Sequence, residues 1–138
     1  MRIVLDTDVV VSAMRSATGA SAEILLRVRA GRAVILATVP LFVEYEEVVH
    51  RPEHLLGAQV SPEEADKFLD VLAALIEPVE TFFMWRPQLR DADDEMVLET
   101  AVNGRAQAIV TFNVRDFRQA AKAFGLELLT PRDALQRI

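Results

Sequence analysis

The segment that decides the fold is Arg2–Ala13, "RIVLDTDVVVSA", in which an apolar run stops at two aspartates and then resumes. The run from Ile3 to Leu5 is typical of a strand that is buried on both faces of a parallel sheet. A buried carboxylate is costly unless it is paired, so Asp6 either caps the next helix or holds a positive charge. One acid is enough for a cap, yet Asp8 follows two residues later.

Segments typical of strands and helices alternate along the chain. We predict strands at 3–5, 33–38, 79–83, 107–111 and 126–130, helices at 7–14, 21–31, 40–50, 61–76, 95–104 and 116–125, and a loop at 84–94. The helix from Ser61 has the clearest start, because Pro62 follows the cap and Glu64 completes a capping box. This alternation predicts a single α/β domain over residues 1–138 with a mostly parallel sheet.

The composition restricts the chemistry that is available. The 138 residues carry a net charge of −6, and they include no cysteine and only two histidines. Without thiolates and with His50 and His54 in one short segment, a bound metal would be held by oxygen, which favours Mg²⁺ or Mn²⁺. No apolar stretch approaches the roughly 20 residues that cross a bilayer, and no signal segment is visible, so we expect a cytoplasmic protein without membrane contact.

Two acids stand out in the first half of the chain. Asp6 ends the first strand, where ligand-binding groups gather in parallel α/β sheets. Glu44 lies in the stripe Leu41, Glu44, Tyr45, Val48, which is one helix face, whereas Glu46 and Glu47 fall on other faces. A glutamate in such a stripe either reaches past its edge to solvent or points into a shared polar site.

Two more acids stand out in the second half. The segment "RDADDE" places four acids at a helix start, which is more than capping requires. Asp94 shares a face with Val97 and Leu98 and is our preferred site residue, although Glu95 remains an alternative. Asp116 follows the strand at 107–111 and either caps the next helix or joins the site.

Each of these acids has an ordinary structural explanation, but their joint placement does not. Strand ends and helix starts converge at one edge of a parallel sheet, so Asp6, Glu44, Asp94 and Asp116 are expected to meet there. Carboxylates that meet repel one another unless cations neutralise them. We therefore predict that these four acids are metal ligands and catalytic residues.

The sequence resembles the PIN-domain family. The matching segments are "IVLDTDVVVSA", "VPLFVEYEEVV", "RDADDEMVLETAVNGRAQAIVT" and "TFNVRDF", and the subgroup most similar is that of bacterial VapC-type toxins of toxin–antitoxin systems. The resemblance implies a three-layer α/β/α fold with a five-stranded sheet of order 3-2-1-4-5. It further implies a Mg²⁺- or Mn²⁺-dependent ribonuclease that acts on RNA, often forms a homodimer and is inhibited by an antitoxin protein.

Carried over by position, Asp6, Glu44 and Asp94 match the three core acids of the family, and Asp116 matches a more variable fourth. Asp8 stands where the family commonly has Asn, which would add a charge beside the metal. We expect Thr7, Thr111 and Asn113 to orient carboxylates or contact phosphate. Arginines would flank the RNA, and the candidates are Arg15, Arg51, Arg90 and Arg115.

Other functions remain open at this point. The segment Asp6–Val10 also fits the opening motif of haloacid-dehalogenase-like phosphatases, in which Asp6 would be the nucleophile; neither lysine of the chain follows a predicted strand end, as that class requires. A receiver domain would need an acid at the end of a later strand, where "VILATVP" has none. A catalytically inactive PIN-fold binding module is the third alternative.

Overall fold

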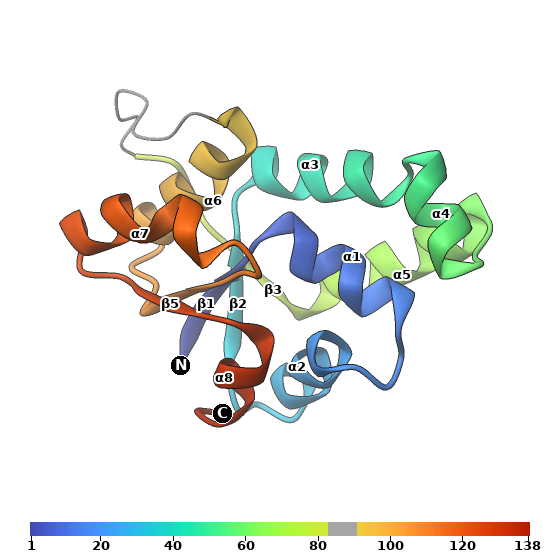
Figure 1. The fold of residues 1–138 in the computed structure, drawn as a ribbon, viewed down its shortest axis with the longest axis horizontal. Helices are drawn as coiled ribbons and strands as arrows, with labels where there is room; N and C mark the ends of the chain where they lie inside the picture. The colour runs from blue at the N-terminus through green and yellow to red at the C-terminus, as the bar shows by residue number, and fades with distance from the viewer. Residues whose placement is uncertain (83–90) are drawn as a thin grey trace.

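The computed structural model describes residues 1–82 and 91–138, which build one five-stranded sheet covered by helices (Figure 1). The strands are β1 (Arg2–Leu5), β2 (Val34–Ala37), β3 (Ile76–Pro78), β4 (Ala108–Val110) and β5 (Glu127–Leu129). Their order is β3-β2-β1-β4-β5, and all four neighbouring pairs are parallel. The predicted α/β class and the order 3-2-1-4-5 are confirmed.

The helices form a layer on each face of the sheet. They are α1 (Thr7–Arg15), α2 (Ala20–Arg29), α3 (Val39–Val49), α4 (Pro52–Ala58), α5 (Pro62–Leu75), α6 (Ala92–Asn103), α7 (Val114–Ala123) and α8 (Pro131–Leu135). Right-handed crossovers place α1 to α5 over one face and α6 and α7 over the other. In agreement, α6 packs on β1, β2 and β4, while α2 packs on α1, α5 and α8.

The central strands supply the core, and the helices that follow them begin at one edge of the sheet. Ile3, Val4 and Leu5 of β1 are fully buried, as are Ile35 and Leu36 of β2. In Figure 1, β1 and β2 run upward to the edge where α1 and α3 begin. The buried Tyr45 hydroxyl of α3 donates a hydrogen bond to the Leu5 carbonyl, which fixes α3 against the end of β1.

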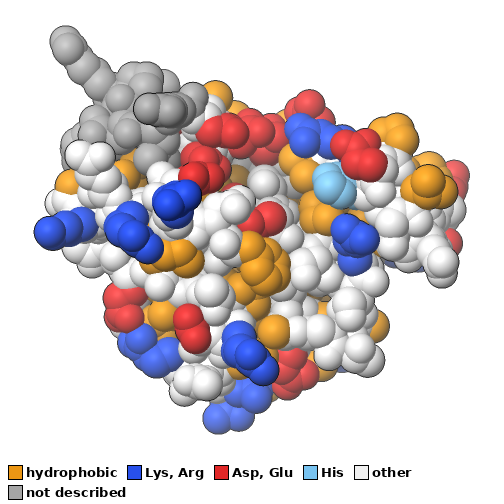
Figure 2. Space-filling view, viewed as in Figure 1, with side chains coloured by type: hydrophobic (Ala, Val, Ile, Leu, Met, Phe, Trp, Pro, Cys, Tyr) orange, Lys and Arg blue, Asp and Glu red, His pale blue; other side chains and the backbone are white. Residues whose placement is uncertain are grey.

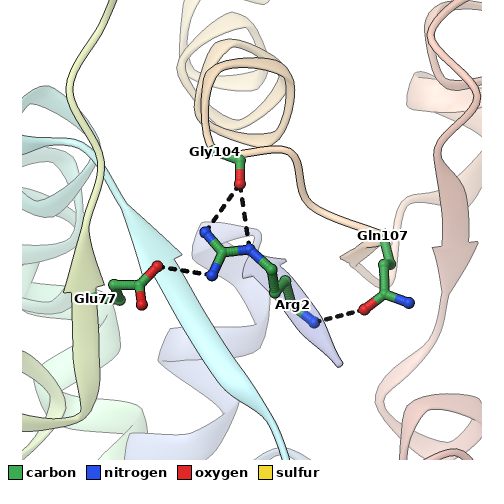
Figure 3. A network of polar contacts seen from close by, with 4 residues as sticks. All are labelled: Arg2, Glu77, Gly104 and Gln107. Atoms are coloured by element: carbon green, nitrogen blue, oxygen red, sulfur yellow. Dashed lines mark hydrogen bonds and ion pairs between the residues drawn. The ribbon is translucent and has the colours of Figure 1, made fainter.

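At the opposite edge, Arg2 joins elements from three parts of the chain (Figure 3). Its guanidinium reaches across β2 to the Glu77 carboxylate, with an Nη1 to Oε2 distance of 2.8 Å. The same group donates to the Gly104 carbonyl at the end of α6, and the Arg2 backbone N–H donates to Gln107 Oε1 at 2.9 Å. The start of β1 is thereby tied to β3, to α6 and to the turn before β4.

Several predictions about local structure were wrong. The third strand is Ile76–Pro78 and not 79–83, because α5 ends at Leu75 and the next residues pair with β2 in the register Ile35↔Ile76. A proline is acceptable there because β3 is an edge strand. The last residue of that predicted strand and most of the predicted loop at 84–94 lie outside the described residues.

The other errors concern helices: α6 begins at Ala92, inside the predicted loop at 84–94, and α8 was not predicted. Helix α4 was not predicted, although Pro52 occupies its first turn. Asp116 was considered as the cap of its helix, but α7 begins earlier, with Asn113 as N-cap and Asp116 in the first turn. In contrast, the capping box of Ser61 and Glu64 is present as predicted.

No single helix in the described part of the chain is long and apolar enough to cross a membrane. Taken together, α1 and α2 have the length and composition, but the two are bent by 96° relative to each other. Both helices also bury side chains in the core, among them Val10 and Ile24.

Candidate active site

Asp6 lies directly after β1 and is only 3% exposed. Its Oδ1 accepts the Thr7 backbone N–H at 2.7 Å, so Asp6 is the N-cap of α1. Its Oδ2 accepts the hydroxyl of the buried Thr111 at 2.7 Å, across the sheet from the end of β4. Burial raises the pKa of Asp6, and these hydrogen bonds oppose the rise. Asp6 is therefore both a cap and a residue held in one orientation.

Thr111 is itself positioned by the turn that follows β4. The Asn113 backbone N–H donates to Thr111 Oγ1 at 2.9 Å, which leaves the Thr111 hydroxyl proton for Asp6. Thr111 is fully buried, so solvent does not compete for this chain of hydrogen bonds. The prediction that Thr111 orients a carboxylate agrees with this geometry.

Asp8 bonds to the same turn as Asp6 but does not cap α1. Its Oδ2 accepts the Phe112 backbone N–H and the Asn113 side-chain amide, both at 3.2 Å. Its Oδ1 is buried, and within residues 1–82 and 91–138 it has no hydrogen-bond partner. Burial first, and then the charge of Asp6, raises the pKa of Asp8 from 3.8 to about 7. An orphaned carboxylate oxygen beside another acid is suited to a cation.

Glu44 points inward from α3, as its stripe predicted. The residue is 7% exposed, and Leu41, Tyr45 and Val48 of the same face are buried with it. Burial raises its pKa, as do the charges of Asp93 and Glu47 and a hydrogen bond with the Asp93 carboxyl. Among the described residues, the opposite charge that pairs with Glu44 is the Arg51 guanidinium, at 3.9 Å. Glu44 thus meets the acids of α6 through Asp93.

Asp94 of α6 lies among several other carboxylates. Burial raises its pKa from 3.8 to about 7, and the charges of Asp6, Asp91, Asp116 and Asp93 add to the rise in that order. The three elements that carry Asp6, Asp94 and Asp116 are far apart in sequence. The charges of Asp6 and Asp116 nevertheless act on Asp94, so the fold brings these three side chains near one another.

Asp116 and Glu95 differ in how they relate to this group. Asp116 is exposed in the first turn of α7, and its charge acts on Asp94. Glu95 is half-buried, and its charge raises the pKa of Glu99, one turn further along α6. These contacts favour Asp94 over Glu95 as the third acid, and the assignment of either residue to catalysis stays a prediction.

We define the acid cluster as the carboxylates whose charges act on one another from different elements, which are Asp6, Asp8, Glu44, Asp91, Asp93, Asp94 and Asp116. Figure 2 shows acidic side chains across the upper middle of one face of the molecule. The sequence did not select Asp93 and noted Asp8 only as an extra charge. The signal for Asp8 was present, because a second acid directly after a buried strand exceeds the need for a cap.

The donor chemistry of the acid cluster fits a hard divalent cation, because it consists of carboxylate oxygens that repel one another. Within residues 1–82 and 91–138, however, no three His, Asp or Glu side chains are placed so that they could hold one ion. Carboxylates that share excess charge favour separated positions until a cation draws them together. The cluster therefore has the ligands of such a site, but their side chains must move to close on an ion.

Of the four predicted arginines, two line a groove of about 670 Å³ that begins at Thr7 and Asp8. These are Arg15 and Arg51, which are joined there by His54. Arg115 is exposed in the first turn of α7, and Arg90 lies outside the described residues. We call this hollow the basic groove.

Comparisons with known proteins agree with the fold. A family model described as "PIN domain" matches residues 2–115. A search of curated proteins gives no significant match. One similar solved structure is that of VapBC2 from Rickettsia felis bound to a DNA fragment from their promoter; the match has a TM-score of 0.63 and 15% sequence identity and covers 94% of this chain and 98% of that chain. At this identity the likeness concerns the fold alone.

Proposed function

Since the chain belongs to the PIN-domain family, we propose that it is a Mg²⁺- or Mn²⁺-dependent ribonuclease that hydrolyses RNA phosphodiester bonds in the cytoplasm. The single observation that carries the proposal is the meeting of Asp6, Asp8 and Asp94 at the carboxyl edge of the sheet, where the charge of Asp6 raises the pKa of both Asp8 and Asp94, and the charge of Asp94 raises that of Asp8. Carboxylates gathered in this way suit a reaction that needs divalent cations near a phosphate.

In this proposal Asp6 and Asp94 hold the metal directly, and Glu44 is a ligand or the base that positions water. The metal supplies charge stabilisation at phosphorus and a lowered pKa for the attacking water. Thr111 keeps the Asp6 carboxylate in place, because its hydroxyl donates to Oδ2. Burial and the neighbouring charges raise the pKa of Glu44, which makes its carboxylate a better proton acceptor. Asp116, at the exposed rim, would bind a second metal or a water of the first.

The biological role we propose is that of a toxin held inactive by an antitoxin. The support is the likeness of the fold to a chain in the VapBC2 crystal structure, together with the VapC-type motifs of the sequence. We also propose a homodimer, on the family resemblance alone. Inhibition of RNA cleavage by the product of an adjacent small reading frame would test the toxin role, and a lack of inhibition would favour general RNA processing.

The burial of Asp6 speaks against the phosphatase alternative. Both of its oxygens already accept hydrogen bonds, and the side chain is 3% exposed, so it is a poor nucleophile toward a phosphate monoester. Attempts to trap an aspartyl phosphate should fail. A trapped phosphate on Asp6 would replace the nuclease proposal with the phosphatase.

The decisive experiment is RNA cleavage by purified protein with Mg²⁺ or Mn²⁺, compared with Asp6→Asn. Asn is as good an N-cap as Asp, so the variant should fold while its cleavage falls below detection. Asp70→Asn is the matched control, because Asp70 is an exposed acid on α5 and should leave the rate unchanged. Equal cleavage by wild type and Asp6→Asn would refute the proposed site.

A further inference from the structure

Phe112 is an aromatic residue in the turn between β4 and α7 that belongs neither to the core nor to the side chains packed against it. Its side chain is 52% exposed. In contrast, Phe117 is fully buried, and Phe42, Phe68 and Phe124 pack against the core. A single exposed hydrophobic residue is common on protein surfaces. The surroundings of Phe112 therefore decide whether its ring has a role.

The turn after β4 holds Phe112 beside the acid cluster. Its backbone N–H donates to Asp8 Oδ2 at 3.2 Å. The residue before it, Thr111, donates its hydroxyl to Asp6, and the residue after it donates its side-chain amide to Asp8. The Thr111 backbone N–H also donates to the end of β5 at 2.9 Å. Consecutive Cα atoms lie about 3.8 Å apart, so the residue that carries the ring is fixed on both sides at the rim of the proposed reaction site.

An exposed ring in this position suits a nucleobase. Proteins bind single strands of RNA through aromatic rings on which bases stack, together with cations that contact the phosphates. Arg115 and Arg118 are exposed on the helix that follows Phe112, and within residues 1–82 and 91–138 neither forms an ion pair. In Figure 2, hydrophobic surface lies near the centre of the face, below acidic side chains, and basic side chains lie to its left over α7.

Stacking also supplies binding free energy that the charge of the protein does not oppose. The chain carries a net charge of −6, and the acid cluster concentrates carboxylates where a phosphate must approach. Attraction between the protein and the RNA backbone is therefore weak away from a bound cation. A base that stacks on an aromatic ring needs no opposite charge. The Phe112 ring can thus hold a nucleotide beside carboxylates that repel its phosphate.

We infer that the Phe112 ring stacks on a nucleobase adjacent to the cleaved phosphodiester bond, so that the site takes unpaired RNA and favours purines over pyrimidines there. The inference rests on the proposed ribonuclease function, which it extends to the kind of nucleotide that the site accepts. Phe112 is not one of the residues that line the basic groove, so this contact is separate from any phosphate contact of Arg15 and Arg51.

Both parts of the inference follow from the physics of stacking. A base in a duplex cannot reach the ring without leaving its stack and its pairing partner, which costs free energy. Purines offer a larger ring surface than pyrimidines, and stacking strength sets the modest sequence preference of such contacts.

The test measures RNA binding apart from cleavage, on the Asp6→Asn protein with Mg²⁺. Fluorescence anisotropy compares oligoadenylate, oligouridylate and an abasic ribose-phosphate strand of the same length, and affinity should fall in that order. Added to this background, Phe112→Leu keeps an apolar side chain but removes the aromatic face. It should weaken the binding of oligoadenylate about fivefold to tenfold and that of oligouridylate less. Binding of the abasic strand and the slope of log affinity against log salt should not change, because no cation is lost.

Phe112→Trp gives a direct readout of stacking. The indole keeps an aromatic face, so this variant should bind oligoadenylate at least as tightly as the protein with Phe112. Its fluorescence should be quenched more by oligoadenylate than by the abasic strand. The chain has one tryptophan of its own, Trp85, so the signal of the protein without this substitution is subtracted. Equal quenching by the two strands would overturn the inference.

Phe82→Leu is the matched control, because Phe82 is an exposed phenylalanine away from the acid cluster. Its side chain is 74% exposed, and its backbone N–H donates to Asn103 Oδ1 at 2.9 Å. Helix α6 rises about 13 Å between Asp94 and Asn103. The control should leave all three affinities within error. Equal losses in Phe112→Leu and Phe82→Leu, or a loss with the abasic strand, would show that the effect is not base stacking.

Failure of the inference and failure of the proposed function give different results. If the wild type cleaves RNA but Phe112→Leu binds oligoadenylate normally, the function stands and the inference is wrong. If Phe112→Leu loses this binding but no metal supports cleavage by the wild type, the base contact stands within an inactive PIN-fold module. If Phe112→Leu binds RNA normally but escapes the antitoxin protein, the ring is a contact for that partner, which also refutes the inference.

Discussion

Replacing Asp8 with Asn should stabilise the metal-free protein at alkaline pH and leave its stability nearly unchanged in acid. Burial and the charge of Asp6 raise the pKa of Asp8 from 3.8 to about 7. Between about pH 4 and pH 7, the folded protein therefore keeps on Asp8 a proton that the unfolded chain has released. The free energy of unfolding falls as the pH rises from about 4 to 7, and it stays lower above pH 7.

The magnitude follows from the size of that pKa change. If it acted in full, a rise in the pKa of Asp8 from 3.8 to about 7 would change the free energy of unfolding by about 4 kcal/mol. Asp8 is only partly buried, and solvent screens its charge, so we expect about 1–2 kcal/mol. The side chain introduced by Asp8→Asn would keep the hydrogen bonds from Phe112 and Asn113 through its amide oxygen, so repulsion is the main difference between the two proteins.

Urea unfolding in EDTA at pH 5 and pH 8 measures this difference directly. Asp8→Asn should exceed the wild type by about 1–2 kcal/mol at pH 8 and by much less at pH 5. Saturating Mg²⁺ should stabilise the wild type more than the variant, because a ligand that binds the folded state adds stability. A difference that is the same at both pH values would refute the electrostatic explanation.

Two further predictions concern Thr111 and Gly104. Thr111→Val removes the hydroxyl that donates to Asp6 Oδ2, so the rate of RNA cleavage should drop about tenfold or more. The free energy of unfolding should also fall by about 1–3 kcal/mol. Thr111→Ser keeps the donor and should restore most of the rate. Gly104→Ala places a methyl group 2.9 Å from a Val79 side-chain atom and 3.0 Å from a Leu36 side-chain atom. The free energy of unfolding measured in urea should therefore fall by about 1–3 kcal/mol. An unchanged value would mean that these side chains move aside freely.

The sheet could be predicted from the sequence because its central strands are continuous apolar runs. Residues 3–5 and 108–110 are buried on both faces, so no alternating pattern competes with their interpretation as parallel strands. The edge strand β3 could not be placed in this way. Ile76 continues the apolar stripe of α5, whereas the helix ends at Leu75, because Pro78 disfavours helical backbone at Glu77 and residues 76–78 pair with β2.

The candidate site was predictable where a polar residue breaks an apolar pattern. Asp6 ends a buried strand and Glu44 interrupts a buried stripe, so both were visible without a structure. Asp8 and Asp93 were not selected, because their importance depends on which residue lies across the sheet or on the next helix. Asp8 bonds to residues more than a hundred positions away, and Asp93 acts on Glu44 of α3.

The two hydrogen bonds that Asp8 accepts have a consequence for the turn after β4. Oδ2 accepts hydrogen bonds from the Phe112 backbone N–H and the Asn113 side-chain amide, while Oδ1 has no partner among the described residues. A cation bound at Oδ1 would neutralise the carboxylate whose Oδ2 holds this turn, so occupancy of the site and the strength of both hydrogen bonds would change together. Phe112, with 52% of its surface exposed, would then report occupancy, because its backbone N–H makes one of these two hydrogen bonds.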